Sequence, residues 1–215
     1  MRHAASPSLG WWDEGQGPPP PEGPTVRIVI TQNTTLDGRV EMLDDWFDPA
    51  NQDEELAAEL MRQTEQEEVL LLGRQTFEDF RGYWPQQSED TTGVAASLDA
   101  ADKRVVSSTL TEPGWANTTV IPGDPLEAVR ALREEPGKDV IVTGSITLCH
   151  ALIGAGLVDL YRMFVYPHWQ GRGRGFFPED HPGTGLRRVE ARAFSGGVTY
   201  AAYVPLAGLG SEQDD

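Results

Sequence analysis

Short runs of Val, Ile and Leu alternate along the chain with segments whose apolar residues recur every three or four positions. The first pattern is typical of strands buried on both faces, and the second is typical of helices that cover a sheet. Their alternation predicts an α/β fold with a mostly parallel sheet. The predicted strands span residues 26–32, 69–72, 104–107, 118–121, 140–143 and 160–166, with a last pair at 187–194 and 198–205.

Helices are predicted in the gaps between these strands. In the first of them Asp53, Leu56, Leu60 and Gln63 share one face, because they are spaced three or four residues apart. The predicted helices span residues 49 to about 66, a short segment from Arg74, 125–133 and 146–155.

The last two strands flank Ser195, Gly196 and Gly197, a sequence that favours a tight hairpin. An antiparallel hairpin after mostly parallel units makes the sheet mixed. A plain dinucleotide-binding Rossmann domain does not usually end in this way, so we expect a different α/β family.

The two ends of the chain lack helical and strand periodicity. Residues 1–24 contain Pro18 to Pro21 and several glycines, and they are predicted to form a disordered leader, although Trp11 and Trp12 are unusual in such a segment. One domain is predicted over residues 25–206, followed by an acidic tail over 207–215.

The charge and cysteine content exclude several classes of function. The net charge of −17 argues against a nucleic-acid or anionic-membrane surface. A cytoplasmic protein is expected, because the sequence shows no long apolar run and no signal peptide. The single cysteine, Cys149, excludes an internal disulfide and a multi-cysteine zinc site, so no metal is predicted, and this residue is expected in the core.

The segment from residue 140 to residue 177 carries the most chemical information. Its apolar strand meets a nearly uncharged helix at Gly144 and Ser145, and Ile146 and Thr147 open that helix. Glycine at such a junction lets backbone amides close on a bound group, and the helix N-terminus favours an anion such as phosphate. Ser145 fits this turn with a negative φ, whereas a left-handed conformation would cost it free energy.

A second candidate phosphate loop follows the strand at 69–72. Gly73 lets the chain turn, and Arg74 and Thr76 add a guanidinium and a hydroxyl at the start of a helix. An ordinary helix start with a surface arginine explains the same residues.

A third candidate lies at the end of the strand at 104–107. The hydroxyls of Ser107 and Ser108 stand where ligands bind in open α/β sheets, and such groups can bind a ribose or its 2′-phosphate. Lys103 and Arg104 would add positive charge if they face the same way. Serine is also common at strand ends for structural reasons.

The Asp37-Gly38 pair after the first strand predicts a turn, which Asp37 would close by accepting hydrogen bonds from backbone amides. Trp46 belongs to a group of aromatic residues that would wall a flat ring or fill the core. Asp53 would either point inward with Leu56 or stabilise the start of its helix.

Several of these segments, at their spacing, resemble the dihydrofolate-reductase-like proteins, particularly the C-terminal reductase domain of RibD, a riboflavin biosynthesis protein. The resemblance covers residues 25–205 and is strongest in 73–78 and 140–177. It implies a three-layer α/β/α fold with a central mixed sheet that ends in an antiparallel hairpin.

The resemblance also implies NADPH as cofactor. Its phosphates and ribose would contact the three candidate loops, which comprise Gly73, Arg74 and Thr76, then Ser107 and Ser108, then Gly144, Ser145, Ile146 and Thr147. Leu36, Trp46 and Thr143 would border the substrate, and Asp37 or Asp53 would be the catalytic acid.

The function implied is NADPH-dependent reduction of a small pterin-like or pyrimidine-like heterocycle by a homodimer. Riboflavin-pathway reductases have a substrate-binding glutamate where this chain has Thr143, which disfavours that pathway. The alternative class is a nucleotide-binding or interaction module that keeps the fold without turnover.

Overall fold

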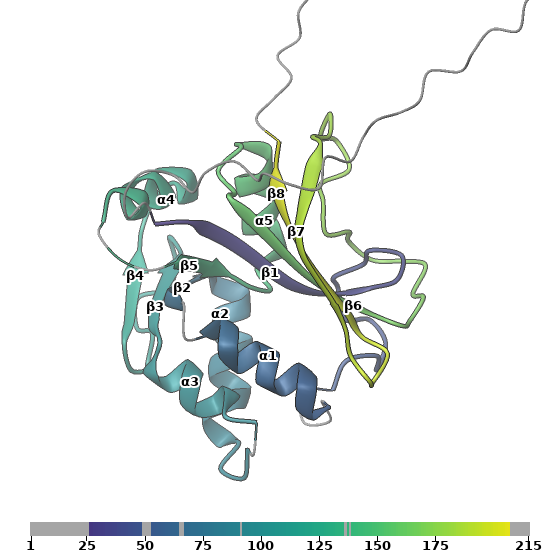
Figure 1. Ribbon diagram of the computed structural model, residues 1–215. Coiled ribbons are helices and arrows are strands. Elements are labelled where there is room, and N and C mark those ends of the chain that lie inside the picture. The colour runs from purple at the N-terminus through teal and green to yellow at the C-terminus, as the bar shows by residue number, and fades with distance from the viewer. Residues whose placement is uncertain are drawn as a thin grey trace, which may run out of the picture.

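The computed structural model describes residues 26–48, 53–64, 67–90, 92–135, 137 and 139–206. The predicted leader, Trp11 and Trp12, and the acidic tail lie outside these residues. In the described part of the chain, eight strands form one mixed sheet in the order β4-β3-β2-β5-β1-β6-β8-β7 (Figure 1). The strands from β4 to β6 in this order are parallel, and β8 runs antiparallel to both β6 and β7.

The mixed sheet and its terminal hairpin confirm the predicted fold class. The strands are β1 (Ile28–Thr35), β2 (Glu67–Gly73), β3 (Asp102–Val106), β4 (Thr118–Ile121), β5 (Asp139–Val142), β6 (Leu160–Tyr166), β7 (Leu186–Ala193) and β8 (Thr199–Pro205). Strands β4 and β6 match the predicted bounds, whereas β1 continues three residues further than predicted because its polar end pairs with β6 through Thr35.

Helices cover both faces of the sheet. They are α1 (Glu54–Thr64), α2 (Arg74–Tyr83), α3 (Val94–Ala100), α4 (Pro125–Glu134) and α5 (Ile146–Gly154), with a short 3-10 helix at Trp84–Gln86. One buried cluster joins the sheet to α4 and α5, and a second joins it to α1, α2 and α3. The molecule therefore has the three layers that the resemblance implied.

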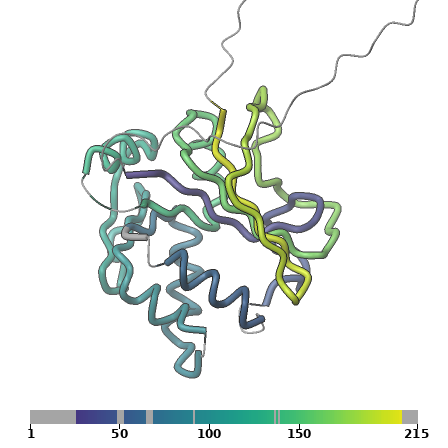
Figure 2. Tube along the Cα trace, in the orientation of Figure 1, coloured from purple at the N-terminus to yellow at the C-terminus, as the bar shows by residue number. Residues whose placement is uncertain are grey.

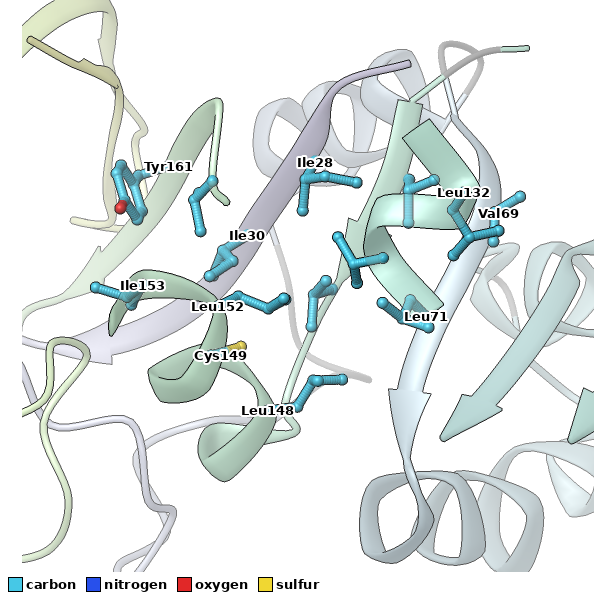
Figure 3. Close-up of a cluster of buried hydrophobic side chains, with 14 of the residues drawn as sticks. Ile28, Ile30, Val69, Leu71, Leu132, Leu148, Cys149, Leu152, Ile153 and Tyr161 are labelled. Atoms are coloured by element: carbon cyan, nitrogen blue, oxygen red, sulfur yellow. The ribbon is translucent and has the colours of Figure 1, made fainter. Parts of the chain in front are cut away.

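The core on the α4 and α5 face is made of aliphatic side chains from the parallel strands and the two helices. Ile28 and Ile30 of β1 face Leu152 of α5, and Cys149 lies among them (Figure 3). Cys149 is 1% exposed, which confirms its predicted place in the core. This packing fixes α5 against the sheet and so fixes where its N-terminus lies.

Two helix predictions need correction. Helix α1 begins at Glu54 rather than at residue 49, because the Asp53 carboxylate accepts the Leu56 amide and caps the helix there. Helix α3 was not predicted; it spans only seven residues and none of them is fully buried, so its apolar pattern is too short to identify a helix. Among the described helices, none has the length and hydrophobicity needed to cross a lipid bilayer.

Candidate functional site

Six parallel strands end at the same edge of the sheet, and the loops that follow them bring the candidate residues together. Strand β2 is followed directly by α2, and the neighbouring strand β5 is followed after a short turn by α5. The N-termini of α2 and α5 therefore lie beside each other at the carboxyl edge, where open α/β sheets bind ligands.

Residues 144 and 145 join β5 to α5, and we call them the Gly144–Ser145 turn. The Ser145 amide donates to Thr76 Oγ1 at 2.8 Å, and Ser145 Oγ accepts the Gly73 amide at 3.0 Å. These bonds tie the turn to the loop between β2 and α2. The structure thus brings two of the three predicted phosphate loops into direct contact.

Both residues of the turn adopt left-handed backbone conformations. Gly144 has φ of +56°, and a Cβ added there would lie 2.7 Å from Thr76 Cγ2, so only glycine fits. Ser145 has φ of +39°, which does not meet the condition of a negative φ. The left-handed conformation costs a non-glycine residue about 1–2 kcal/mol, and the two hydrogen bonds of Ser145 offset it at about 1 kcal/mol each.

The amides of this turn are occupied by protein groups. Gly144 donates to Gln32 Oε1 at 3.1 Å, and Ser145 donates to Thr76 as described. The idea that the turn itself faces a phosphate is therefore wrong for these two amides. The amides of Ile146 and Thr147, which open α5, have no carbonyl partner within their helix and are the donors left for an anion.

Helix α2 offers the same kind of donors. Its first amides, at Arg74 and Gln75, have no intrahelical partner. The Arg74 side chain is exposed and its Nη1 lies 2.7 Å from Glu78 Oε2, one helical turn away. Arg74 is thus the first residue of α2, and in this structure its charge is paired with a carboxylate.

The β3 loop lies further along the same edge. Ser107 is buried, and its Oγ accepts the amides of Thr109 and Leu110 at 3.2 and 3.0 Å. Its hydroxyl therefore shapes the loop, whereas Ser108 is exposed at the surface. Of the two predicted hydroxyls, only that of Ser108 is presented to solvent.

Lys103 and Arg104 do not contribute to this edge. Lys103 is fully buried and its ammonium donates to the carbonyls of Leu98 and Ala101, at the end of α3, and burial lowers its pKa. Arg104 pairs with Asp102 at the start of β3. The expectation that they add free positive charge at this edge is wrong, because the Lys103 ammonium is bound by backbone carbonyls and the Arg104 guanidinium is paired with a carboxylate at the start of the strand.

On the other side of the edge, residues 36–44 lie against residues 168–177, and we call these segments the paired loops (Figure 2). Asp37 joins them: it accepts the Thr35 hydroxyl at 2.6 Å and the Gly171 amide at 2.8 Å. The Thr35 hydrogen bond is the main cause that lowers its pKa to about 2. Asp37 thus accepts hydrogen bonds from backbone amides as predicted, but these are the amides of Gln170 and Gly171 in the opposite loop. An ionised, fully bonded carboxylate is poorly suited to be a catalytic acid.

Ion pairs complete the contact between the paired loops. Arg172 lies 2.6 Å from Asp44, and Arg174 lies 2.6 Å from Glu41, whose pKa it lowers through a side-chain hydrogen bond. Both arginines belong to the glycine-containing loop after β6. In the structure each is paired with a carboxylate of the opposite loop.

The proposed substrate residues surround the paired loops. Trp46 donates from its indole to Gln170 at 3.0 Å and stacks on the His168 ring, while Leu36 is 72% exposed. Thr143 is half-buried at the end of β5. His168 was not singled out from the sequence, although a histidine two residues after a predicted strand end is a signal that identifies it.

Of the two alternatives for Asp53, the structure supports the second, in which it stabilises the start of its helix, and not the inward-pointing acid. Its carboxylate accepts the Leu56 amide at 2.8 Å and the Gly196 amide at 3.0 Å. It therefore caps α1 and ties this helix to the turn between β7 and β8. Both oxygens are used for structure, which argues against proton donation from this residue.

Comparison with known proteins identifies the family of the chain. The model of the RibD C-terminal domain matches residues 26–200. An uncharacterized protein, YyaP of Bacillus subtilis, is 28% identical over 179 residues, which cover 82% of this chain and 94% of that protein.

Two solved structures share the fold at low identity. A putative riboflavin biosynthesis protein from Shewanella has a TM-score of 0.64 and 18% identity over 84% of this chain and 99% of its own. Dihydrofolate reductase from Enterococcus faecalis, solved with NADP(H), has a TM-score of 0.56 and 16% identity over 83% of this chain and 96% of its own.

Proposed function

Because the chain belongs to the RibD C-terminal domain family, we propose that it is an NADPH-dependent reductase of a small heterocyclic substrate. The substrate would be pterin-like or pyrimidine-like and would accept a hydride at a C=N or C=O bond. The similar dihydrofolate reductase structure contains NADP(H), which supports this choice of cofactor.

One observation carries the proposal: the start of α2 is bonded to the start of α5 through the Ser145 side chain and amide. Two adjacent helix N-termini present several amide donors to one place, which suits a diphosphate. Arg74 at the first position of α2 adds a guanidinium. When a phosphate binds, this guanidinium would break its ion pair with Glu78 and bind a phosphate oxygen instead.

The chain's own groups would mainly bind and orient. NADPH supplies the hydride when it is bound. The amides of Ile146 and Thr147 would hold its phosphates, and Ser108 would contact the adenosine side. The paired loops would border the nicotinamide and the substrate, with Leu36 and Trp46 beside the ring.

A second candidate function is a nucleotide-binding module without turnover. It is favoured by one specific observation, which is that Asp37 and Asp53 are both committed to backbone amides. A reductase of this chain would then take its proton from water or from another group. The riboflavin-pathway reaction is disfavoured by Thr143, as the sequence indicated.

Calorimetric titration with NADPH and NADH tests the cofactor. We expect NADPH to bind and to raise the melting temperature, and Arg74→Ala to weaken the binding about tenfold through loss of a charge-assisted hydrogen bond. Arg130→Ala, at an exposed position of α4, is the matched control and should bind NADPH as the unaltered protein does.

The result that would contradict the proposal is an unchanged melting temperature with millimolar NADPH. Oxidation of NADPH with a panel of pterins and pyrimidines, followed at the absorbance of the reduced nicotinamide, then separates a reductase from a binding module.

A further inference from the structure

A buried glutamine, Gln32, lies on the central strand β1 beside the turn that the proposed function places at the phosphates. It is 7% exposed, although most of the side chains around it are apolar. A buried side-chain amide costs free energy unless it is hydrogen-bonded, so its hydrogen-bond partners indicate its role.

The partners of Gln32 are the two peptide groups of Gly144. Its Nε2 donates to the Gly144 carbonyl at 2.5 Å, and its Oε1 accepts the Gly144 amide at 3.1 Å. A side-chain amide thus makes both bonds that a neighbouring strand would make to one residue.

The position of Gln32 in the sheet explains this arrangement. The pairing of β1 with β5 ends at Ile30 and Val142, where the chain after β5 leaves the sheet. Two residues after Ile30 comes Gln32, and two residues after Val142 comes Gly144. The glutamine side chain continues the ladder after the strand backbone has turned away.

The third contact of Gln32 is with α5. Its Nε2 lies 3.3 Å from Cys149 Sγ, and burial raises the pKa of this thiol to about 12, so the thiol that contacts the amide is neutral. The Gln32 side chain therefore connects β1, the Gly144–Ser145 turn and the first turn of α5 through contacts between uncharged groups.

We propose that Gln32 is a positioning residue for the cofactor. It holds the Gly144–Ser145 turn in its left-handed conformation, so that Ser145 reaches both Gly73 and Thr76 and the amides opening α2 and α5 converge on one diphosphate. Gln32 acts through Gly144 and does not touch the cofactor. This inference rests on the proposed NADPH site.

The side chain at position 32 must offer a donor and an acceptor at the right reach. Methionine has nearly the same length and shape but neither group, so Gln32→Met leaves the Gly144 amide without its partner and leaves the carbonyl only its weak contact with the Cys149 thiol at 3.5 Å. Asparagine keeps the amide on a shorter stem, so Gln32→Asn is expected to retain the fold and to lose part of the effect.

The experiment measures NADPH affinity by calorimetry in both variants. Gln32→Met is expected to raise the Kd for NADPH about tenfold, which is the effect of roughly one lost hydrogen bond, and Gln32→Asn by less. The Kd for adenosine 2′-monophosphate, which has no diphosphate, should change less than about twofold in either variant.

Gln63→Met is the matched control. Gln63 is also a buried glutamine, and it donates to Glu59 at 2.6 Å on α1, away from the carboxyl edge. This variant should lose stability without losing NADPH affinity. A global loss of stability would instead weaken both ligands equally in all three variants, and that pattern overturns the inference.

Hydrogen exchange provides a readout that needs no ligand. In Gln32→Met the amides of Gly144 to Thr147 should exchange faster, while those of the β7 and β8 hairpin stay unchanged. Unchanged exchange in this segment overturns the positioning role. A failure of the proposed function is recognised separately, because the unaltered protein would then not bind NADPH at all.

Discussion

The two halves of the carboxyl edge are held by different forces. The Gly144–Ser145 turn is held by neutral hydrogen bonds from Gln32, Thr76 and its own serine. The paired loops are held largely by carboxylates, since Asp37 binds amides of the opposite loop and two arginines bind Asp44 and Glu41.

The two halves also differ in burial. Ser145 and Gln32 are less than a tenth exposed, whereas Arg172 and Arg174 have side chains that are more than half exposed. Buried neutral bonds are insensitive to salt and pH, while exposed ion pairs are screened by salt and depend on carboxylate ionisation. We therefore expect a rigid Gly144–Ser145 turn beside more adaptable paired loops.

The largest effect is expected from adding a methyl group to the turn. Gly144→Ala meets Thr76 Cγ2 at 2.7 Å and keeps a left-handed φ, so unfolding by denaturant should show a loss of about 3 kcal/mol.

Gly73→Ala is the control for this prediction. Gly73 has φ of −78°, and an added Cβ would lie 3.8 Å from Ser145, an ordinary contact. Its stability should stay the same or rise slightly, because alanine restricts the unfolded chain. Equal stability of the two alanine variants would show that the turn is not rigid.

Acid should loosen the paired loops before the turn. The pKa of Asp37 is lowered from 3.8 to about 2, so this carboxylate stabilises the folded state above pH 3.8. That stability is lost as the pH falls from about 4 to about 2. The protection of the Gln170 and Gly171 amides, measured against the intrinsic exchange rate at each pH, should therefore fall over this range, while that of the Ser145 amide should not.

Asp37→Asn should already show the faster exchange at neutral pH and should not change further in acid. If the Asp37→Asn variant and the unaltered protein respond alike to acid, then Asp37 does not hold the loops together.

Two substitutions of Ser145 separate strain from hydrogen bonding. Ser145→Ala keeps the left-handed strain and loses the bond to Gly73, whereas Ser145→Gly loses the bond but relieves the strain. The glycine variant should be more stable than the alanine variant by about 1 kcal/mol in denaturant titrations. The reverse order would mean that this backbone conformation is not costly.

The smallest effect is expected at the exposed ion pairs. Arg174→Gln removes the pair with Glu41 and should cost less than about 0.5 kcal/mol at low salt and almost nothing in 0.5 M NaCl. Thermal unfolding at both salt concentrations checks this. A large loss of stability that persists at high salt would show that this ion pair is not screened, and that the paired loops are held as rigidly as the turn.

Continuous apolar segments made much of the fold predictable. Strand β6 and the start of α4 were found from the sequence because their patterns and caps are local: Asp124 caps α4 and Pro125 follows at its first position. Helix α3 was missed, and so was the burial of Lys103, because this lysine is satisfied by carbonyls that only the folded chain brings near it.

The candidate site was predictable only in part. The glycine at position 144 and the acidic turn at position 37 were identified from local sequence. The committed partners of Asp37, Asp53 and Ser145 were not, since their bonds reach the Gly171, Gly196 and Gly73 amides in other loops.

The sequence by itself determined the strands along the chain, most of the helices between them, the terminal hairpin and the positions of the glycine turns, because periodicity and turn residues act over a few neighbours. Only the tertiary structure decided which amides remain free for a ligand. Gln32 and Gly144 are 112 residues apart in the chain, and no local sequence pattern predicts their contact. The free donors are set by what the other elements leave unbound, and that depends on the packed sheet.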